Sequence, residues 1–240
     1  MKKLIACLFL TFVFCGIGFC GSVIQIIQDS MPAMVILESY NVQIVQGQDT
    51  YVKDGPMLAV VKPVGISQYT RKGGGVIVDP SGLIVANSHT TQQAGRVKVV
   101  LADNTEYQAE ILVFSPDDDL AILRIKPDAP LKYITLADIN KIKLGDPVYN
   151  VGRSDILKDS ISEGKIIGIG TKTDPADKSV STQMLKIDFN VYQGDSGGPV
   201  LNKDGELLGL ILGGSVTSGR LALAVPSNKI KKYLDDALSR

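Results

Sequence analysis

The sequence has 240 residues, in which 25 Lys and Arg balance 25 Asp and Glu. A hydrophobic content of 45% excludes a disordered chain, and the zero formal net charge gives no electrostatic basis for binding nucleic acid. The one histidine is His89 and all three cysteines lie in the first 20 residues, so a zinc site of His and Cys ligands is not expected in the body of the protein. We therefore expect no metal and no cofactor.

The N-terminus has the pattern of a secretory signal peptide. Two lysines precede an apolar run over residues 4–21, and small residues gather at the end of this run. Residues 1–22 are therefore predicted to be a signal peptide that is cleaved within residues 18–22. An uncleaved membrane anchor is the alternative, because residues 4–28 carry no charge. Cleavage would export a chain without cysteine, which suits the bacterial periplasm or the extracellular space.

From residue 34 onward, short runs of β-branched and apolar residues alternate with turn residues. Evenly spaced short strands predict an all-β protein and leave no room for the crossover helices of a parallel sheet. Turn residues that accept a positive φ join neighbouring runs at 79–82, 103–104 and 204–205. The expected strands are 34–37, 58–61, 75–78, 83–86, 96–101, 107–113 and 120–125, and then 147–152, 161–170, 184–190, 199–202, 206–212 and 220–225.

The strands fall into two groups of similar size, which predicts two β-barrels side by side. We expect an N-terminal barrel over residues 23–135 and a C-terminal barrel with a terminal helix over residues 136–240. Ser227 is the expected N-cap of that helix. Its apolar residues repeat at helical spacing on one face: Ile230, Tyr233, Leu234 and Ala237. A second short helical turn is expected just after His89.

A glycine-rich turn with a serine at its centre is the sharpest local feature. Residues 193–199 read QGDSGGP. A serine flanked by glycines can be held exposed, and the missing side chains let a substrate carbonyl approach the backbone. The predicted oxyanion hole comprises Gly194, Asp195 and Ser196, with the N–H groups of Gly194 and Ser196 as donors. An ordinary glycine-rich turn between strands is the alternative.

A serine nucleophile needs a base and a residue that orients the base. His89 follows the predicted strand 83–86, and Asp119 opens the predicted strand 120–125, where its carboxylate can be drawn inward to the imidazole. The neighbours Asp117 and Asp118 are expected to be solvated. A structural histidine and a charged loop are the alternatives.

The order of these residues distinguishes between two families of hydrolase. In the α/β-hydrolases the nucleophile precedes the acid and the histidine, but no histidine follows Ser196 in this chain. The order histidine, aspartate, serine is that of the chymotrypsin-type proteases.

Five segments in order then resemble the trypsin-like serine proteases, and more narrowly the bacterial high-temperature-requirement (HtrA/Deg) family: GGGVIVDPSGLIVANSH, DDDLAIL, GDPVYNVG, ISEGKIIGIG and QGDSGGPVLNKDGELLGLI. The resemblance covers about residue 28 to the C-terminus. It implies two packed six-stranded antiparallel barrels, with His89 as general base, Asp119 as the acid that orients it and Ser196 as nucleophile. It also implies cleavage of unfolded or damaged envelope proteins, as in protein quality control, and a homo-oligomer such as a trimer.

The chain departs from the narrower family in three ways. We expect no PDZ domain after the barrels. Asp195 stands where the family usually has Asn; in digestive enzymes an Asp there pairs with a new N-terminal amine, so a different partner is expected here. The segment between the first strand and the glycines at 73–75 is short, so we expect no long trimer-stabilising loop.

The resemblance also locates a substrate pocket. Asn190 is expected at its base, where an uncharged residue would not select Lys or Arg. Val191 and the strand 210–214 are expected to form its walls, with the lining residues Leu212, Gly213 and Gly214. Substrates with a small or medium aliphatic side chain at the cleaved position are then expected, unless Asn190 points elsewhere.

The predicted function is that of an exported serine endopeptidase acting on polypeptides, without nucleic acid. The alternatives are a protease that cuts a single signalling partner, and a non-catalytic or dormant binding protein (a holdase) on the same fold. Dormancy would arise if the glycine-rich segments 194–198 and 213–219 were mobile.

Overall fold

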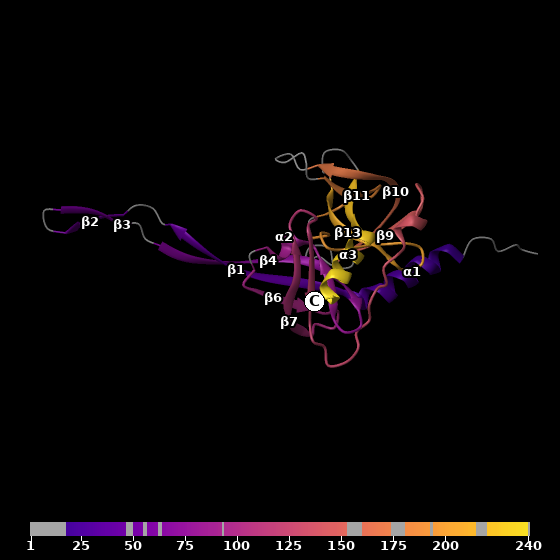
Figure 1. The fold of residues 1–240 in the computed structure, drawn as a ribbon, viewed down its shortest axis with the longest axis horizontal. Coiled ribbons are helices and arrows are strands. Elements are labelled where there is room, and N and C mark those ends of the chain that lie inside the picture. Colours follow the sequence, from indigo (N-terminus) through magenta and orange to yellow (C-terminus); the bar gives the residue numbers. More distant parts are fainter. Residues whose placement is uncertain are drawn as a thin grey trace, which may run out of the picture.

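The computed structural model of the chain describes residues 18–46, 50–54, 57–61, 64–92, 94–152, 160–173, 181–192, 194–214 and 220–239. Two closed six-stranded antiparallel barrels and a C-terminal helix make up most of it (Figure 1). The predicted fold class is thereby confirmed. The first 17 residues of the expected signal peptide lie outside the described residues, and so does part of the segment 213–219.

The first barrel consists of β1 (Met34–Gln46), β4 (Val64–Asp79), β5 (Leu83–Ala86), β6 (Arg96–Val100), β7 (Glu106–Ser115) and β8 (Leu120–Arg124), and it closes in the order β1-β4-β5-β8-β7-β6. All four residues of β5 are buried, whereas β6 buries only Val97 and Val99. The alternation in β6 places every second side chain in the core. Asn104, with φ 68°, lies in the predicted turn between β6 and β7.

The second barrel consists of β9 (Pro147–Gly152), β10 (Ser160–Thr173), β11 (Ser181–Ile187), β12 (Pro199–Leu201), β13 (Leu207–Gly214) and β14 (Ala222–Pro226), and it closes in the order β10-β11-β14-β13-β12-β9. A connecting segment with the 3-10 turn η2 (Ile139–Lys141) leads into it from the first barrel. Buried apolar side chains of both barrels form one continuous cluster, in which Tyr149 and Leu210 join Ile122 and Leu123. The barrels are therefore packed directly on each other.

A long two-stranded arm corrects the expectation of a short connection after the first strand. β1 pairs with β4 along its whole length, from Met34 opposite Val76 to Gln46 opposite Val64. Only residues 36–40 of β1 also pair with β6. Beyond the barrel lie β2 (Thr50–Asp54) and β3 (Met57–Val61), which pair with each other at the far end of the arm (Figure 1). Residues 58–61 form a strand as expected, but this strand lies outside the barrel. A hydrophobic run predicts a strand and does not predict its partner.

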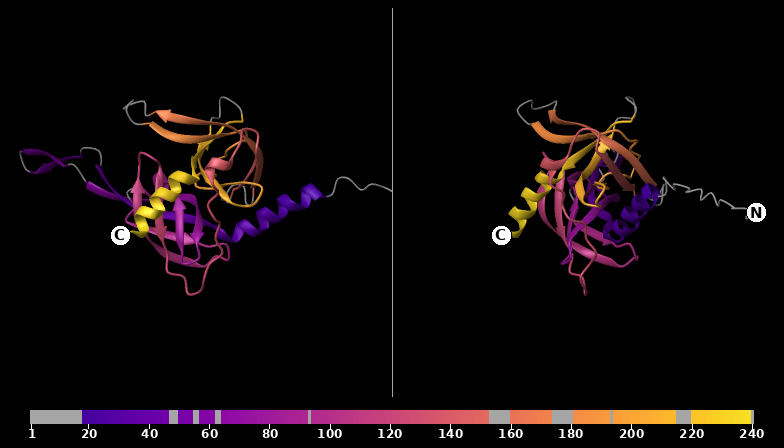
Figure 2. Two further views of the ribbon diagram at one scale, coloured as in Figure 1. Left: turned by 45° about the vertical axis from the view of Figure 1, so that its right-hand side comes forward. Right: turned by 90° about the vertical axis from the view of Figure 1, so that its right-hand side faces the viewer.

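A helix that the sequence analysis did not expect lies at the other end of the molecule. This helix, α1 (Gly18–Ser30), continues past residue 22 and joins β1 through the 3-10 turn η1 (Met31–Ala33) (Figure 2). Ile27 is buried and Ile26 packs against the core, so this part of α1 belongs to the fold. Within the described residues, no helix combines the length and apolar character that crossing a membrane requires.

The C-terminal helix α3 (Ser227–Leu238) leaves the second barrel and contacts β7 and β8 of the first (Figure 2). Ile230 and Leu234 are buried, as the helical spacing predicted. The expectation that Ser227 is the N-cap was wrong, because Pro226 holds that position. The Ser227 hydroxyl instead donates to the Ala137 carbonyl at 2.8 Å and ties the helix start to the segment that connects the barrels.

Candidate active site

His89 and Asp119 are in direct contact, although they come from different elements. His89 lies in the short helix α2 (Ser88–Thr91) after β5, and Asp119 directly precedes β8. The imidazole Nδ1 is 2.7 Å from Asp119 Oδ2. Because β5 and β8 are paired neighbours, with Ala86 opposite Ala121, the ends of the two strands bring these side chains together.

The residues just before His89 hold the aspartate in place. Asp119 Oδ1 accepts hydrogen bonds from the His89 backbone N–H and the Ser88 hydroxyl, both at 2.9 Å. The Asn87 side chain donates to the Asp119 carbonyl at 3.2 Å. Sequence reasoning did not assign roles to Asn87 and Ser88, but a polar pair at the end of the buried strand β5 was a usable signal. Asp119 has φ 47°, in the left-handed region of backbone conformation that is unfavourable for residues other than glycine.

Ser196 lies in the turn before β12 and is a half-buried residue. The hydroxyl donates to the Leu212 carbonyl at 3.3 Å, which is long for such a bond. Among the hydrogen bonds of the described residues, none joins Ser196 to His89. Hydrogen bonds of this kind are often formed only when substrate binds, so the geometry is compatible with a role for Ser196 as nucleophile.

The glycines of β4 bring the serine and histidine turns together. The backbone N–H of Gly74 donates to the Ser196 carbonyl at 3.0 Å, and Gly197 lies directly against the Gly74 carbonyl. The neighbouring Gly73 lies against the Thr90 side chain, next to His89. Consecutive glycines of one strand thus contact both turns, and a side chain at Gly73 would collide with Thr90. On the same strand Arg71 donates to the His89 carbonyl at 3.0 Å.

The backbone around Ser196 offers two N–H groups for an oxyanion. Gly194 and Gly197 have φ angles of 102° and 81°, which shape the turn. The Asp195 N–H is used by the Tyr192 carbonyl at 3.1 Å. Within the described part of the chain, the N–H groups of Gly194 and Ser196 have no acceptor.

Asp195 is buried beneath this turn at 1% exposure. Its Oδ2 accepts a hydrogen bond from the Tyr192 backbone N–H at 2.8 Å. Burial raises the pKa of Asp195 above its usual value, and the hydrogen bond from Tyr192 opposes this shift. Among the described residues, Asp195 Oδ1 and both polar atoms of the buried Asn150 side chain lack hydrogen-bond partners. Asn150 Oδ1 lies near Gly198, and so close to the same turn.

The expectation that Asp118 is solvated was wrong. Asp118 Oδ1 is 2.6 Å from Lys229 Nζ, and both side chains are only 18% exposed. Its Oδ2 accepts a hydrogen bond from the Tyr233 hydroxyl at 2.6 Å. Asp117 is exposed. The residue before Asp119 is thus bound by the C-terminal helix.

The residues expected in the substrate pocket lie on two neighbouring segments. Asn190 is exposed, whereas Val191 is half-buried and lies against the Gly214 backbone. Leu212 contacts Ser196 through its carbonyl. Gly213 borders open space, because a side chain there would meet nothing within 4 Å.

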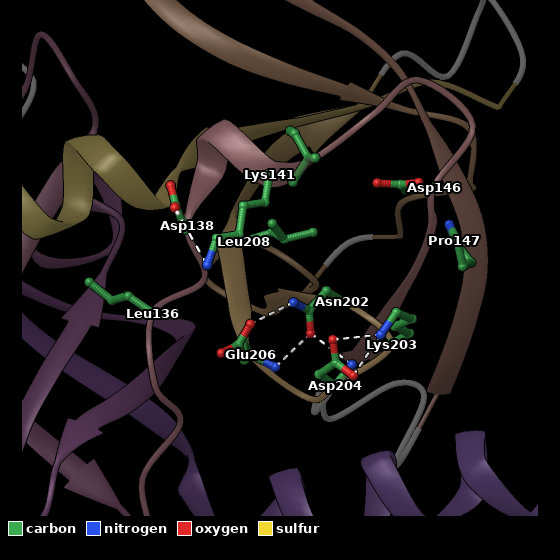
Figure 3. Close-up of a pocket in the computed structure, with 11 residues that line it drawn as sticks. Leu136, Asp138, Lys141, Asp146, Pro147, Asn202, Lys203, Asp204, Glu206 and Leu208 are labelled. Atoms are coloured by element: carbon green, nitrogen blue, oxygen red, sulfur yellow. Dashed lines mark hydrogen bonds and ion pairs between the residues drawn. The ribbon is translucent and has the colours of Figure 1, made fainter.

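A separate cavity of about 450 Å³ lies between the connecting segment and the β12–β13 hairpin (Figure 3). Its polar groups largely satisfy one another: Asn202 Oδ1 accepts from the N–H groups of Asp204 and Glu206, and its amide donates to Glu206. These bonds shape the hairpin turn. The candidate site residues around His89, Asp119 and Ser196 do not line the cavity, whose lining is Leu136, Asp138, Lys141, Ile142, Asp146, Pro147, Asn202, Lys203, Asp204, Glu206 and Leu208.

Residues 73–210 match the family of trypsin-like peptidase domains. The chain is also similar to several bacterial proteins. A "probable periplasmic serine endoprotease DegP-like" of Rickettsia conorii is 30% identical over 167 residues, and one of Brucella suis is 31% identical over 179 residues. A "probable periplasmic serine protease do/HhoA-like" of Haemophilus influenzae is 28% identical over 170 residues.

These similarities cover most of this chain but a minor part of the relatives. The matched share is 68%, 70% and 69% of this chain in the three cases, against 33%, 33% and 36% of the relatives. The chain thus spans about a third of the length of the relatives it matches, and the similarity concerns that part of them.

Proposed function

Because the chain belongs to the trypsin-like peptidase family, we propose that it is a serine endopeptidase in which His89, Asp119 and Ser196 act as the catalytic triad. The observation that carries the proposal is the contact between His89 Nδ1 and Asp119 Oδ2 at 2.7 Å, at the place where β4 joins the histidine and serine turns. An imidazole oriented by a partly buried carboxylate is the base that a serine hydroxyl requires.

The proposed reaction begins with rotation of the Ser196 hydroxyl away from the Leu212 carbonyl. With its Nδ1–H donated to Asp119, the imidazole presents the lone pair of Nε2 as the acceptor for the Ser196 proton. The serine oxygen then attacks the carbonyl carbon of the peptide bond, and His89 returns the proton to the leaving amine. The resulting acyl-enzyme is hydrolysed by a water molecule that His89 activates in the same way.

The N–H groups of Gly194 and Ser196 are the proposed donors to the oxyanion, because the N–H of Asp195 is already used. In the proposed role of Asp195, its side chain supports the turn through Tyr192 instead of binding substrate. Removal of one oxyanion donor typically lowers the rate by about 10²–10³-fold.

For the substrate pocket we retain Asn190, Val191, Leu212, Gly213 and Gly214. The contact between Val191 and the Gly214 backbone brings the two segments together, and the uncharged character of all five residues supports a pocket without charge. The proposed substrates are polypeptides with small or medium aliphatic side chains at the cleaved bond. The similarity to probable periplasmic proteases supports export to the periplasm, where unfolded or damaged envelope proteins would be the targets. A homo-oligomer stays a prediction.

A fluorophosphonate probe tests the proposal, because it labels only an activated serine. We expect purified protein to be labelled, and Ser196→Ala to lose labelling and to lower peptide hydrolysis by about 10⁴–10⁶-fold. Thr91→Ser, which keeps the buried hydroxyl that bonds Ser88, is the matched control and should stay active.

Absence of labelling in folded protein at every pH tested would overturn the peptidase proposal. If the same protein suppressed aggregation of a denatured client, the holdase would become the favoured function.

A further inference from the structure

We propose that the C-terminal helix positions the acid of the triad through a latch formed by Ser115, Asp118, Lys229 and Tyr233, here called the α3 latch. The inference rests on the proposed function, since it concerns how Asp119 is held against His89. The four latch residues do not contact the proposed reacting atoms. They are therefore positioning residues.

The α3 latch binds both carboxylate oxygens of Asp118 with side chains of one helix. Lys229 Nζ lies 2.6 Å from Oδ1, and the Tyr233 hydroxyl donates to Oδ2 at 2.6 Å. The Ser115 hydroxyl lies 2.9 Å from the Tyr233 hydroxyl. Burial and the hydrogen bond to Asp118 raise the pKa of Tyr233, so the phenol stays protonated and donates to Asp118, while Ser115 donates to the phenol oxygen.

The ion pair within the α3 latch is shielded from water. Lys229 and Asp118 are each 18% exposed, whereas the other ion pair of α3, Lys231 with Asp235, is 65% and 62% exposed. Solvent weakens exposed ion pairs, so the partly buried pair of Lys229 with Asp118 is the one that fixes geometry. Lys231 and Asp235 thus provide a matched control on the same helix.

The α3 latch acts on a turn that needs external support. Asp119 has φ 47° and its N–H donates to the Pro116 carbonyl at 3.1 Å. A non-glycine residue keeps such a conformation only when its surroundings hold it there. Asp119 is held on one side by Ser88 and His89, and its neighbour Asp118 is held on the other side by α3.

This arrangement couples the two barrels at the site. α3 follows β14, the last strand of the second barrel, and Ser196 also belongs to this barrel. The turn at 116–119 belongs to the first barrel. The position of α3 against the first barrel therefore sets the orientation of Asp119, and through it that of the imidazole.

The test compares Asp118→Asn, Lys229→Met and Tyr233→Phe with the control Lys231→Met. Each variant is first checked for its thermal unfolding, and active sites are titrated with a fluorophosphonate so that rates refer to competent molecules. We expect kcat for a peptide substrate to fall by about 10-fold to 10²-fold in the three latch variants with KM unchanged. Lys229→Arg should restore most of kcat, because it keeps the ion pair, and Lys231→Met should match the parent.

A second measurement is independent of activity. His89 is the one histidine of the chain, so nitrogen-15 labelling of histidine gives a single imidazole in the NMR spectrum. In the Ser196→Ala background, we expect the latch variants to shift or broaden the Nδ1–H signal, and Lys231→Met to leave it unchanged. An altered imidazole signal, together with a parent protein that keeps Ser196 and yet shows neither probe labelling nor peptide hydrolysis, would support the α3 latch while overturning the proposed function. Normal kcat per active site with an unchanged imidazole signal would overturn the α3 latch itself.

Discussion

Asp195 is the residue whose burial has the clearest thermodynamic consequence. Burial raises its pKa above the ordinary 3.8, so the folded protein binds this proton more tightly than the unfolded chain. The contribution of Asp195 to the free energy of unfolding is therefore most favourable at acid pH. It declines as the pH rises from the ordinary pKa to the folded one, and then stays constant.

We expect Asp195→Asn in the Ser196→Ala background to raise the Tm at pH 7, because the amide removes the cost of ionisation while its carbonyl still accepts from Tyr192. The gain is about 2–4 °C for each kcal/mol removed, and it should vanish near pH 4. Calorimetry between pH 4 and 8 measures it. An equal difference in Tm at every pH would contradict ionisation as the cause.

Residues in the site differ in how far the sequence predicted them. The contact of His89 with Asp119 was expected from their places at the ends of two predicted strands, although the sequence did not predict that these strands pair. The roles of Asp118 and Lys229 do not, because these residues lie 111 positions apart and no local pattern joins them. Only packing of α3 on the first barrel brings them together.

At the scale of elements, the contact between β4 and the turn that carries Ser196 depends on Gly197. This residue has φ 81°, and a side chain there would collide with the Gly74 carbonyl. We expect Gly197→Ala to destabilise the protein by about 1–3 kcal/mol and to lower the rate of fluorophosphonate labelling at least ~10-fold.

Gly145→Ala separates the effect of backbone strain from the effect of a collision with β4. Gly145 has φ 90°, but a side chain there meets nothing within 4 Å. The Gly145→Ala variant should have a lower Tm through backbone strain alone, and its labelling rate should equal that of the parent. Equal loss of labelling in both variants would show that general destabilisation, and not the contact with β4, accounts for the effect.

Strands were predictable because β-branched runs and turn residues are local signals, and each expected run overlaps an observed strand, although the run 184–190 extends beyond the end of β11 at Ile187. Their partners were not, since pairing depends on where the chain turns back. β3 therefore lies in the arm, although its sequence resembles that of barrel strands. The continuation of α1 to Ser30 was not predicted, because the apolar residues at its start were assigned to the signal peptide.

At the scale of the whole molecule, the arm is separable from the barrel. Residues 36–40 of β1 pair on both sides, but residues 41–46 pair only with β4. We expect a variant in which an Asn-Gly turn replaces residues 42–68, joining the paired residues Asn41 and Tyr69, to keep a cooperative unfolding transition and fluorophosphonate labelling. Calorimetry and probe labelling measure both, and loss of the transition would show that the first barrel needs the arm to fold.

β4 runs without interruption from Val64, on the arm, to Asp79, beside β5. The same strand donates the Gly74 N–H to the carbonyl of Ser196. A twist or pull imposed on the arm at Val64 by anything that grips it would thus travel along the covalent backbone of β4 to Gly74, and from there to Ser196 through a single backbone hydrogen bond.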